Sequence, residues 1–229
     1  MGYRSHIIFA AMKLNTVIFD MDGLLIDSEP LWQIAAEDLF NKYNKQLTAA
    51  QYAQSTGLRT KEFLECWFTH FNLPVAKIDE AESKIVKQVI DLVKQKGKPM
   101  PGLEYIFNFF INRNFKIGLA SSSPAALIEV VLDLLDILNH VQAISSAENL
   151  HFGKPHPEVY LNCAEKLESL PVECICFEDS YNGMIAAKAA KMKCVIVPSL
   201  PQIKNKAWDA ADGKITTLSN FNELLLSSL

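Results

Sequence analysis

The chain has 229 residues, of which 49% are hydrophobic and 21% charged, with 9 glycines and 10 prolines. This composition is that of a globular protein and excludes disordered and collagen-like chains. The length suits one large domain, or a core domain with a smaller insertion. The formal net charge of −4 leaves no basic field to gather polyphosphate, so we expect no nucleic-acid partner.

The amino-terminal segment and the cysteines indicate where the protein works. Residues 7–12 form an apolar run, but Lys13 ends it before the roughly 7 to 15 apolar residues that a signal peptide needs. No run reaches the roughly 20 apolar residues of a membrane span. The five cysteines lack the spacing of a disulfide framework, so we expect reduced thiols. We therefore expect a cytoplasmic monomer without a membrane partner, with Met12 as an alternative start to Met1.

Short apolar runs alternate with helical patterns over most of the chain. Strands are predicted at residues 16–19, 115–120, 141–144, 174–177 and 194–197, and helices at 122–138, 158–167 and 184–192. Cys174 and Cys176 stand two apart in one of these runs, which predicts a shared strand face; a metal-binding pair is the alternative, and no metal is assigned. The alternation predicts an α/β fold with a doubly wound, mostly parallel, Rossmann-like sheet covered on both faces.

The stretch 27–97 breaks this alternation, because it has helix signals and no strand-like run. Ser28 and Pro30 predict a helix start, and Asp79 with Glu82 resembles a capping box. Aromatic residues at four-residue spacing, at positions 63, 67 and 71, continue the helical pattern. We therefore predict a small all-helical cap domain at 27–97, inserted after the first strand of a core domain made of residues 12–26 and 98–229.

Two carboxylates follow the first predicted strand. Asp20 stands at its carboxyl end, where open α/β sheets bind ligands, and an unperturbed pKa near ~3.9 would leave it ionised and able to attack phosphorus. Asp22 could protonate a leaving oxygen and later deprotonate water. Gly23 suits the tight turn that this arrangement needs. Alone, the Asp-x-Asp-Gly motif also marks ordinary turns and calcium loops.

Two further loops carry candidate phosphate ligands. Ser121 ends the second strand, where its hydroxyl and the loop amides, that of Ser122 included, could hold a phosphoryl oxygen. Ser122 or Ser123 is predicted to cap the following helix, which leaves Ser121 free. Lys154 stands in a stiff Gly-Lys-Pro loop, where it could neutralise a phosphate and an attacking carboxylate; the alternative is a solvated surface lysine.

Adjacent acids end another predicted strand. Glu178 and Asp179 would be costly to leave facing each other, and a divalent cation is the usual remedy. Mg²⁺ prefers oxygen ligands, which Asp20, Asp179 and the backbone carbonyl of Asp22 could supply. The alternative is a solvated acidic helix N-terminus, which explains one acid better than two.

In chain order, these motifs resemble the haloacid dehalogenase superfamily of phosphotransferases. The resemblance starts at Leu14 and rests on Asp20-Met-Asp22-Gly, Ser121, Gly-Lys154-Pro and Glu178-Asp179-Ser. The helical insertion resembles the cap of the β-phosphoglucomutase-like subgroup. The tracts 19–32 and 154–164 are similar to those of 2-deoxyglucose-6-phosphate and hexitol phosphate phosphatases.

The resemblance implies a role for each motif. Asp20 would be the nucleophile that forms an aspartyl phosphate, and Asp22 the general acid and base. The implied phosphate ligands are Ser121, Ser122 and Lys154, and the implied magnesium ligands are Asp20, Asp22 and Asp179, with Glu178 in support. One departure is Lys191, where relatives often have glycine.

The resemblance also implies that the cap chooses the substrate. The loop with Thr56, Gly57 and Arg59 would face the sugar, and Trp32 would line the entrance. The alternatives are that Trp32 belongs to the core and that Arg59 only caps a helix.

The predicted function is a magnesium-dependent phosphomonoesterase acting on small sugar or sugar-alcohol phosphates. The first alternative is a β-phosphoglucomutase-type phosphotransferase, which returns the phosphoryl group to a sugar. The second is a phospho-accepting receiver domain of signalling proteins. In receivers, however, the acidic pair precedes the acceptor and no helical insertion follows it.

Overall fold

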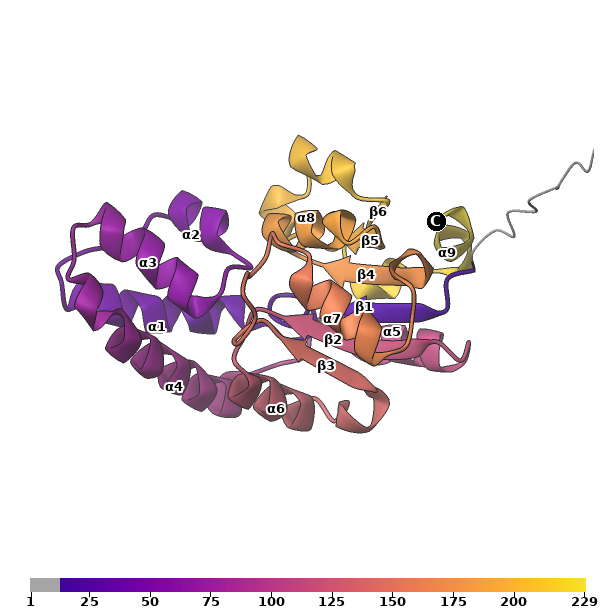
Figure 1. Cartoon of the computed structure of the whole chain (residues 1–229), viewed down its shortest axis with the longest axis horizontal. Coiled ribbons are helices and arrows are strands. Elements are labelled where there is room, and N and C mark those ends of the chain that lie inside the picture. The colour runs from indigo at the N-terminus through magenta and orange to yellow at the C-terminus, as the bar shows by residue number, and fades with distance from the viewer. Residues whose placement is uncertain (1–12) are drawn as a thin grey trace, which may run out of the picture.

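The computed structural model describes residues 13–229. The apolar run at 7–12 and the alternative start at Met12 lie outside this range. Six strands form one sheet in the order β3-β2-β1-β4-β5-β6, and every neighbouring pair is parallel (Figure 1). The strands are β1 Thr16–Phe19, β2 Lys116–Ser121, β3 Ala143–Ser146, β4 Cys174–Glu178, β5 Lys193–Ile196 and β6 Gly213–Lys214. The predicted Rossmann-like sheet is confirmed, and the order differs from the 2-1-3-4-5 order of receiver domains.

Alternate residues of the strands β1 to β5 face two hydrophobic cores, one on each face of the sheet. In β1, Phe19 packs in the core shared with α5 and α6, and Ile18 packs in the core shared with α7 and α8. Cys174 and Cys176 lie in the second core, which confirms their shared strand face. The core helices are α5 Leu103–Ile111, α6 Ala125–Leu134, α7 Glu158–Lys166, α8 Tyr181–Ala189 and α9 Glu223–Ser228.

Local backbone signals move several helix ends away from their predicted positions. The helix predicted at 122–138 is shorter, because Pro124 stands at its N-cap and Asp136 has a left-handed φ of 53° just after it. Helix α8 starts three residues early, because the Ser180 hydroxyl accepts a hydrogen bond from the Gly183 amide and caps it. Helices α5 and α9 and the short strand β6 were not predicted.

Short 3-10 turns join these helices and strands. The turns are η1 Val75–Lys77, η2 Leu138–His140, η3 Pro171–Glu173, η4 Leu200–Gln202, η5 Lys206–Ala210 and η6 Leu218–Asn220. Within residues 13–229, no helix combines the length and the apolar character needed to cross a bilayer.

Four helices between β1 and α5 form an aromatic core that is continuous with the hydrophobic core on the α5 and α6 face of the sheet. They are α1 Glu29–Asn41, α2 Ala49–Ser55, α3 Thr60–His70 and α4 Ile78–Lys96, and they extend beyond one end of the sheet (Figure 1). The Phe40 ring contacts Phe63, Phe68 and Phe71 at centroid distances of 6.1, 6.0 and 5.9 Å. Where the chain leaves and re-enters the core domain, Ile26 and Pro99 form an antiparallel bridge. We infer from this core and this bridge that residues 27–97 act as one cap.

The predicted capping box of the last cap helix is wrong. Lys77 occupies the N-cap of α4, so that Asp79 lies inside the first turn. There its carboxylate pairs with Lys61 of α3 at 2.9 Å. Asp79 therefore joins two cap helices instead of capping one.

Candidate active site

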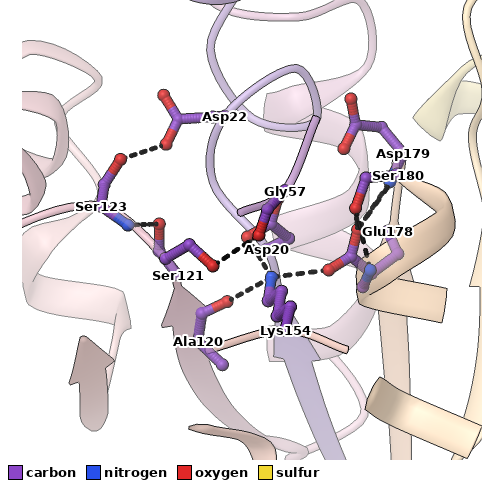
Figure 2. Close-up of polar contacts among 12 residues, drawn as sticks. Asp20, Asp22, Gly57, Ala120, Ser121, Ser123, Lys154, Glu178, Asp179 and Ser180 are labelled. Atoms are coloured by element: carbon purple, nitrogen blue, oxygen red, sulfur yellow. Dashed lines mark hydrogen bonds and ion pairs between the residues drawn. The ribbon is translucent and has the colours of Figure 1, made fainter. Parts of the chain in front are cut away.

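The carboxyl ends of the central strands β1, β2 and β4 meet beneath the cap (Figure 2). Asp20 follows β1 directly, and its backbone amide donates to the Phe177 carbonyl of β4 at 3.0 Å. A cavity of about 230 Å³ opens at these strand ends. Its core side is lined by six of the residues predicted from sequence, namely Asp20, Asp22, Ser121, Ser122, Lys154 and Asp179.

A buried lysine connects two carboxylates at the base of this cavity. Lys154 is 1% exposed, and its Nζ lies 2.6 Å from Asp20 Oδ1 and 2.6 Å from Glu178 Oε1. A third hydrogen bond runs from Nζ to the Ala120 carbonyl at 3.2 Å. Burial alone would lower the pKa of Lys154, but the charges of Asp20 and Glu178 raise it above its usual value. The ammonium group therefore remains charged and fixed beside Asp20.

Glu178 is fully buried, and both of its carboxylate oxygens are occupied. Oε1 accepts from Lys154 and, at 2.6 Å, from the hydroxyl of Tyr160. Oε2 accepts from the Asp179 amide and from the amide and hydroxyl of Ser180. An added Cβ at Gly183 would lie 1.7 Å from Oε1, so only glycine fits there. This geometry makes Glu178 an orienting partner of Lys154, and its supporting role at a metal stays a prediction. Tyr160 is a part of this network that the motifs did not reveal.

Asp179 has an oxygen that lacks a partner. Its Oδ1 is buried and makes no hydrogen bond with any described residue. Carboxylate oxygens of Asp179, Asp20 and Glu178 lie within 4.8 Å of one another. Gly23, with φ +73°, allows this approach, because an added Cβ there would lie 2.1 Å from Asp179 Oδ2. A hard divalent cation fits such a group of close carboxylate oxygens.

The pKa values of Asp179 and Asp20 are both raised, because the two acids are buried close to other negative charges. Burial, followed by the charges of Glu178, Glu29 and Asp20, raises the pKa of Asp179 well above its usual range. Burial and the charge of Glu178 raise the pKa of Asp20 to about 8, although Lys154 acts in the opposite direction. A bound cation would act in the same direction as Lys154 and favour the ionised Asp20 carboxylate that attack on phosphorus requires.

Three donors hold the side chain of Asp22. Its Oδ1 accepts from the Ser28 hydroxyl at 2.6 Å and from the Trp32 indole at 2.9 Å. Its Oδ2 accepts from the Ser123 hydroxyl at 2.6 Å. Ser28 and Trp32 belong to the cap and Ser123 to the core, so both parts of the molecule fix one carboxylate.

The serines after β2 divide their roles differently from the prediction. Neither Ser122 nor Ser123 caps α6, which has no side-chain cap. The Ser122 hydroxyl donates to the Gly57 carbonyl of the cap at 2.7 Å, while Ser121 Oγ accepts from the Ser123 amide at 3.0 Å. The side chain of Ser122 thus binds the cap loop, and its hydroxyl is not directed to a phosphate.

The predicted cap residues lie in two different places. Trp32, Thr56 and Gly57 line the cavity at Asp20. Arg59 lines a separate cavity, and its guanidinium donates to the Leu150 carbonyl at 2.8 Å and pairs with Glu62 at 2.6 Å. The expectation that Arg59 faces the sugar therefore has no support in this geometry, because the side chain reaches back to a core loop.

Cap residues that the motifs did not reveal also line the cavity. Glu29 and Gln33 come from α1, and Tyr52 comes from α2. Only the fold brings these helix faces to the cavity, and the helical period alone does not distinguish them from solvent-facing positions. Glu29 follows Ser28 in the tract that carries the resemblance, which is the one signal that could have pointed to it.

Comparison with known proteins places this geometry in a family. The family model described as haloacid dehalogenase-like hydrolase matches residues 17–197. Hexitol phosphatase B of Escherichia coli (strain K12) is 36% identical over 208 residues, which cover 90% of this chain and 94% of that protein. The phosphorylated carbohydrates phosphatase of Thermotoga maritima is 28% identical over 177 residues, which cover 77% of this chain and 82% of that one.

Solved structures share the fold over nearly the whole chain. The β-phosphoglucomutase of Clostridium difficile has a TM-score of 0.82 at 23% identity, covering 93% of this chain and 96% of that one. CbbY of Rhodobacter sphaeroides, solved with phosphate, has a TM-score of 0.79 at 20% identity, with coverage of 93% and 99%. These structures confirm the fold, and the family match and the 36% identity to hexitol phosphatase B confirm the resemblance found in the motifs: the chain belongs to the haloacid dehalogenase-like hydrolase family and is a phosphatase.

Proposed function

We propose that the protein is a magnesium-dependent phosphomonoesterase that hydrolyses small sugar or sugar-alcohol phosphates through an aspartyl phosphate on Asp20. One observation carries the proposal. The Asp20 carboxylate lies at the base of the cavity, 2.6 Å from a buried ammonium group and beside an acid with an unpaired oxygen. This arrangement suits the attack of a carboxylate on a phosphate whose charge is neutralised from several sides.

The chemistry takes two steps, each of which this chain's residues can perform. In the first, an Asp20 oxygen forms a bond to phosphorus, the bond to the sugar oxygen breaks, and Asp22 donates a proton to that oxygen. In the second, Asp22 takes a proton from water, which attacks the phosphoryl group and releases Asp20 and inorganic phosphate. Lys154 and the loop after Ser121 stabilise the negative charge during both steps.

The acidic group accounts for the magnesium in the proposal. Asp20, Asp179 and the backbone carbonyl of Asp22 would hold the ion, since Glu178 already uses both of its oxygens. When bound, Mg²⁺ supplies positive charge that neutralises the phosphate and the acids. The unpaired Asp179 Oδ1 is the feature of this chain that favours such a ligand role.

The charges around the cavity favour hydrolysis of a monophosphate over mutase chemistry. Among the described residues that line it, Lys154 is the only cation, and it is already paired with two carboxylates. The other charged residues there are the acids Asp20, Asp22, Glu29 and Asp179. A mutase must also bind a sugar bisphosphate, whose second phosphate would meet no positive charge among the described cap residues that line the cavity. The small volume, about 230 Å³, likewise favours a small substrate.

The test measures phosphate release from a panel of hexose, hexitol and 2-deoxyhexose phosphates, with Mg²⁺ or with a chelator. We expect Mg²⁺-dependent release by the wild-type protein and a loss of about ten-thousand-fold or more in Asp20→Asn, with an unchanged circular dichroism spectrum. Substantial Mg²⁺-dependent activity in Asp20→Asn would refute the mechanism. Conversion of β-glucose 1-phosphate to glucose 6-phosphate in the presence of a bisphosphate primer would support the mutase instead.

A further inference from the structure

We propose that Tyr52 is a specificity-determining residue whose phenol donates a hydrogen bond to a hydroxyl group of the leaving sugar or polyol. The proposal rests on the proposed function and adds the part of the substrate that the cap recognises. Tyr52 lies on α2 and lines the same cavity as Asp20 and Lys154. Its hydroxyl oxygen is buried and makes no hydrogen bond to any described residue.

An unpaired buried hydroxyl is a cost to the folded protein, so its presence needs a reason. The ring of Tyr52 stacks on Phe63, with centroids 6.4 Å apart and an angle of 19° between the planes. A phenylalanine ring would make the same stacking contact without the unpaired oxygen. Packing therefore explains the ring of Tyr52 but not its hydroxyl, and a ligand in the cavity would supply the missing partner.

The surroundings of the phenol determine which ligand group it can bind. Burial, followed by the charge of Glu37, raises the pKa of Tyr52 to about 12, so the phenol remains protonated and able to donate. Gln33 lines the cavity from the neighbouring helix, and its amide donates to Glu37 at 2.9 Å. No described cap residue that lines the cavity is a cation. This wall therefore suits a neutral hydroxyl group and not a second phosphate or a carboxylate.

The positions of Asp20 and Tyr52 determine how a substrate would be oriented in the cavity. The phosphate belongs at the strand ends, where Asp20 and Lys154 lie, and the hydroxyl-bearing chain extends toward the cap helix that carries Tyr52. A phosphate ester without such hydroxyls gains nothing from the phenol. Tyr52 should accordingly matter for polyol phosphates and be neutral for an aromatic ester.

The experiment compares Tyr52→Phe with the wild-type protein on hexitol 6-phosphate and on p-nitrophenyl phosphate, at equal Mg²⁺. We expect kcat/KM for the hexitol phosphate to fall about five- to ten-fold, mainly through KM, which is the loss of one neutral hydrogen bond. The value for p-nitrophenyl phosphate should stay within about two-fold, and the unfolding midpoint should be unchanged or higher, because an unpaired hydroxyl is removed. Tyr43→Phe is the matched control, since Tyr43 packs on Phe68 inside the cap and should leave both substrates unaffected.

Two results would overturn the proposal. One is an unchanged kcat/KM of Tyr52→Phe for the hexitol phosphate, and the other is an equal loss on both substrates. Failure of the proposed function is visible separately, because it would appear as absent hydrolysis of p-nitrophenyl phosphate by the wild-type protein. A wild-type enzyme that hydrolyses the aromatic ester but shows no preference for the polyol ester would refute the role of Tyr52 alone.

Discussion

The two walls of the cavity hold their polar groups in different ways. The core wall contains buried charges that bind one another, as in the contacts of Lys154 with Asp20 and Glu178. The cap wall offers mainly neutral groups, among them Tyr52 and Gln33, over an aromatic core, and Glu29 is the one acid among the described cap residues that line the cavity. The comparison teaches that the groups suited to phosphate chemistry are built into the sheet, whereas the groups suited to selecting a leaving group belong to the inserted helices.

The largest expected effect tests the buried charges of the core wall. Lys154→Ala removes the counterion of two buried carboxylates, and we expect the free energy of unfolding to fall by about 3–5 kcal/mol. Urea unfolding at pH 7 without metal measures this loss. Lys77→Ala, which removes an exposed lysine paired with Glu80, is the control and should change little. A Lys154→Ala protein as stable as the wild type would show that the core wall does not depend on this pairing.

The next prediction tests whether the cap has a core of its own. Phe40→Ala empties the centre of the cap aromatic cluster, and we expect a loss of about 3 kcal/mol. Hydrogen exchange should show faster exchange in the cap helices and unchanged exchange in the sheet. Phe110→Ala, which empties the centre of the aromatic cluster under the sheet, is the matched variant and should accelerate exchange in the sheet. Equal effects of both variants on both regions would contradict the division into two walls.

A smaller effect is expected for an ion pair outside the cavity. This pair is less buried than the ion pairs of Lys154, so comparing the two shows how much burial increases the loss of stability when a pair is broken. Asp212 accepts a hydrogen bond from the Cys194 amide at 2.9 Å and pairs with Lys188. Burial alone would raise the pKa of Asp212, but the hydrogen bonds from Lys188 and Cys194 lower it below its usual value. The Asp212 carboxylate therefore binds a proton more tightly in the unfolded chain than in the folded protein. The pair stabilises the folded protein above about pH 4, and this stabilisation decreases as the pH falls further.

We therefore expect Asp212→Asn to cost about 0.5–1 kcal/mol of unfolding free energy at pH 7. The difference from the wild type should shrink steadily below about pH 4, where the carboxylate becomes protonated. Unfolding measured at pH 7, 5 and 3.5 tests the direction. A difference that grows on acidification would contradict the sign.

The smallest expected effect is a gain of stability away from both walls. Lys191 has a left-handed φ of 63° in the turn between α8 and β5, where the resemblance pointed to glycine in relatives. Lys191→Gly should raise the free energy of unfolding by about 0.5–1 kcal/mol, because glycine adopts this conformation without strain. Turnover should not change. Lys191→Ala, which keeps the strain, should give no gain.

The sequence was most informative where a local signal and the strand ends coincide. Asp20 and Asp179 each directly follow a short apolar strand, so the parallel sheet predicted their closeness. Ser28 stands at the start of α1 as predicted, but Ser123 was misassigned as a cap, because a hydroxyl near a helix start can cap the helix or reach a distant acid, and only the fold decides between these partners. The direction of the Arg59 side chain could not be predicted for the same reason, since its partner, the Leu150 carbonyl, lies about 90 residues away in the chain.

The contacts between the cap loop, residues 56–58, and the core determine which substitutions this loop can accept. The Ser122 hydroxyl binds the backbone carbonyl of Gly57, and the Asn182 side chain binds that of Thr56 at 2.9 Å. Every amino acid has a backbone carbonyl, so new side chains at positions 56 and 58 leave these contacts intact. Gly57 alone is constrained, by its φ of +84° and by Ser180 Oγ, which would lie 2.5 Å from an added Cβ. Substitutions at positions 56 and 58 can therefore change the side chains that face the substrate and leave the contacts between the cap and the core in place.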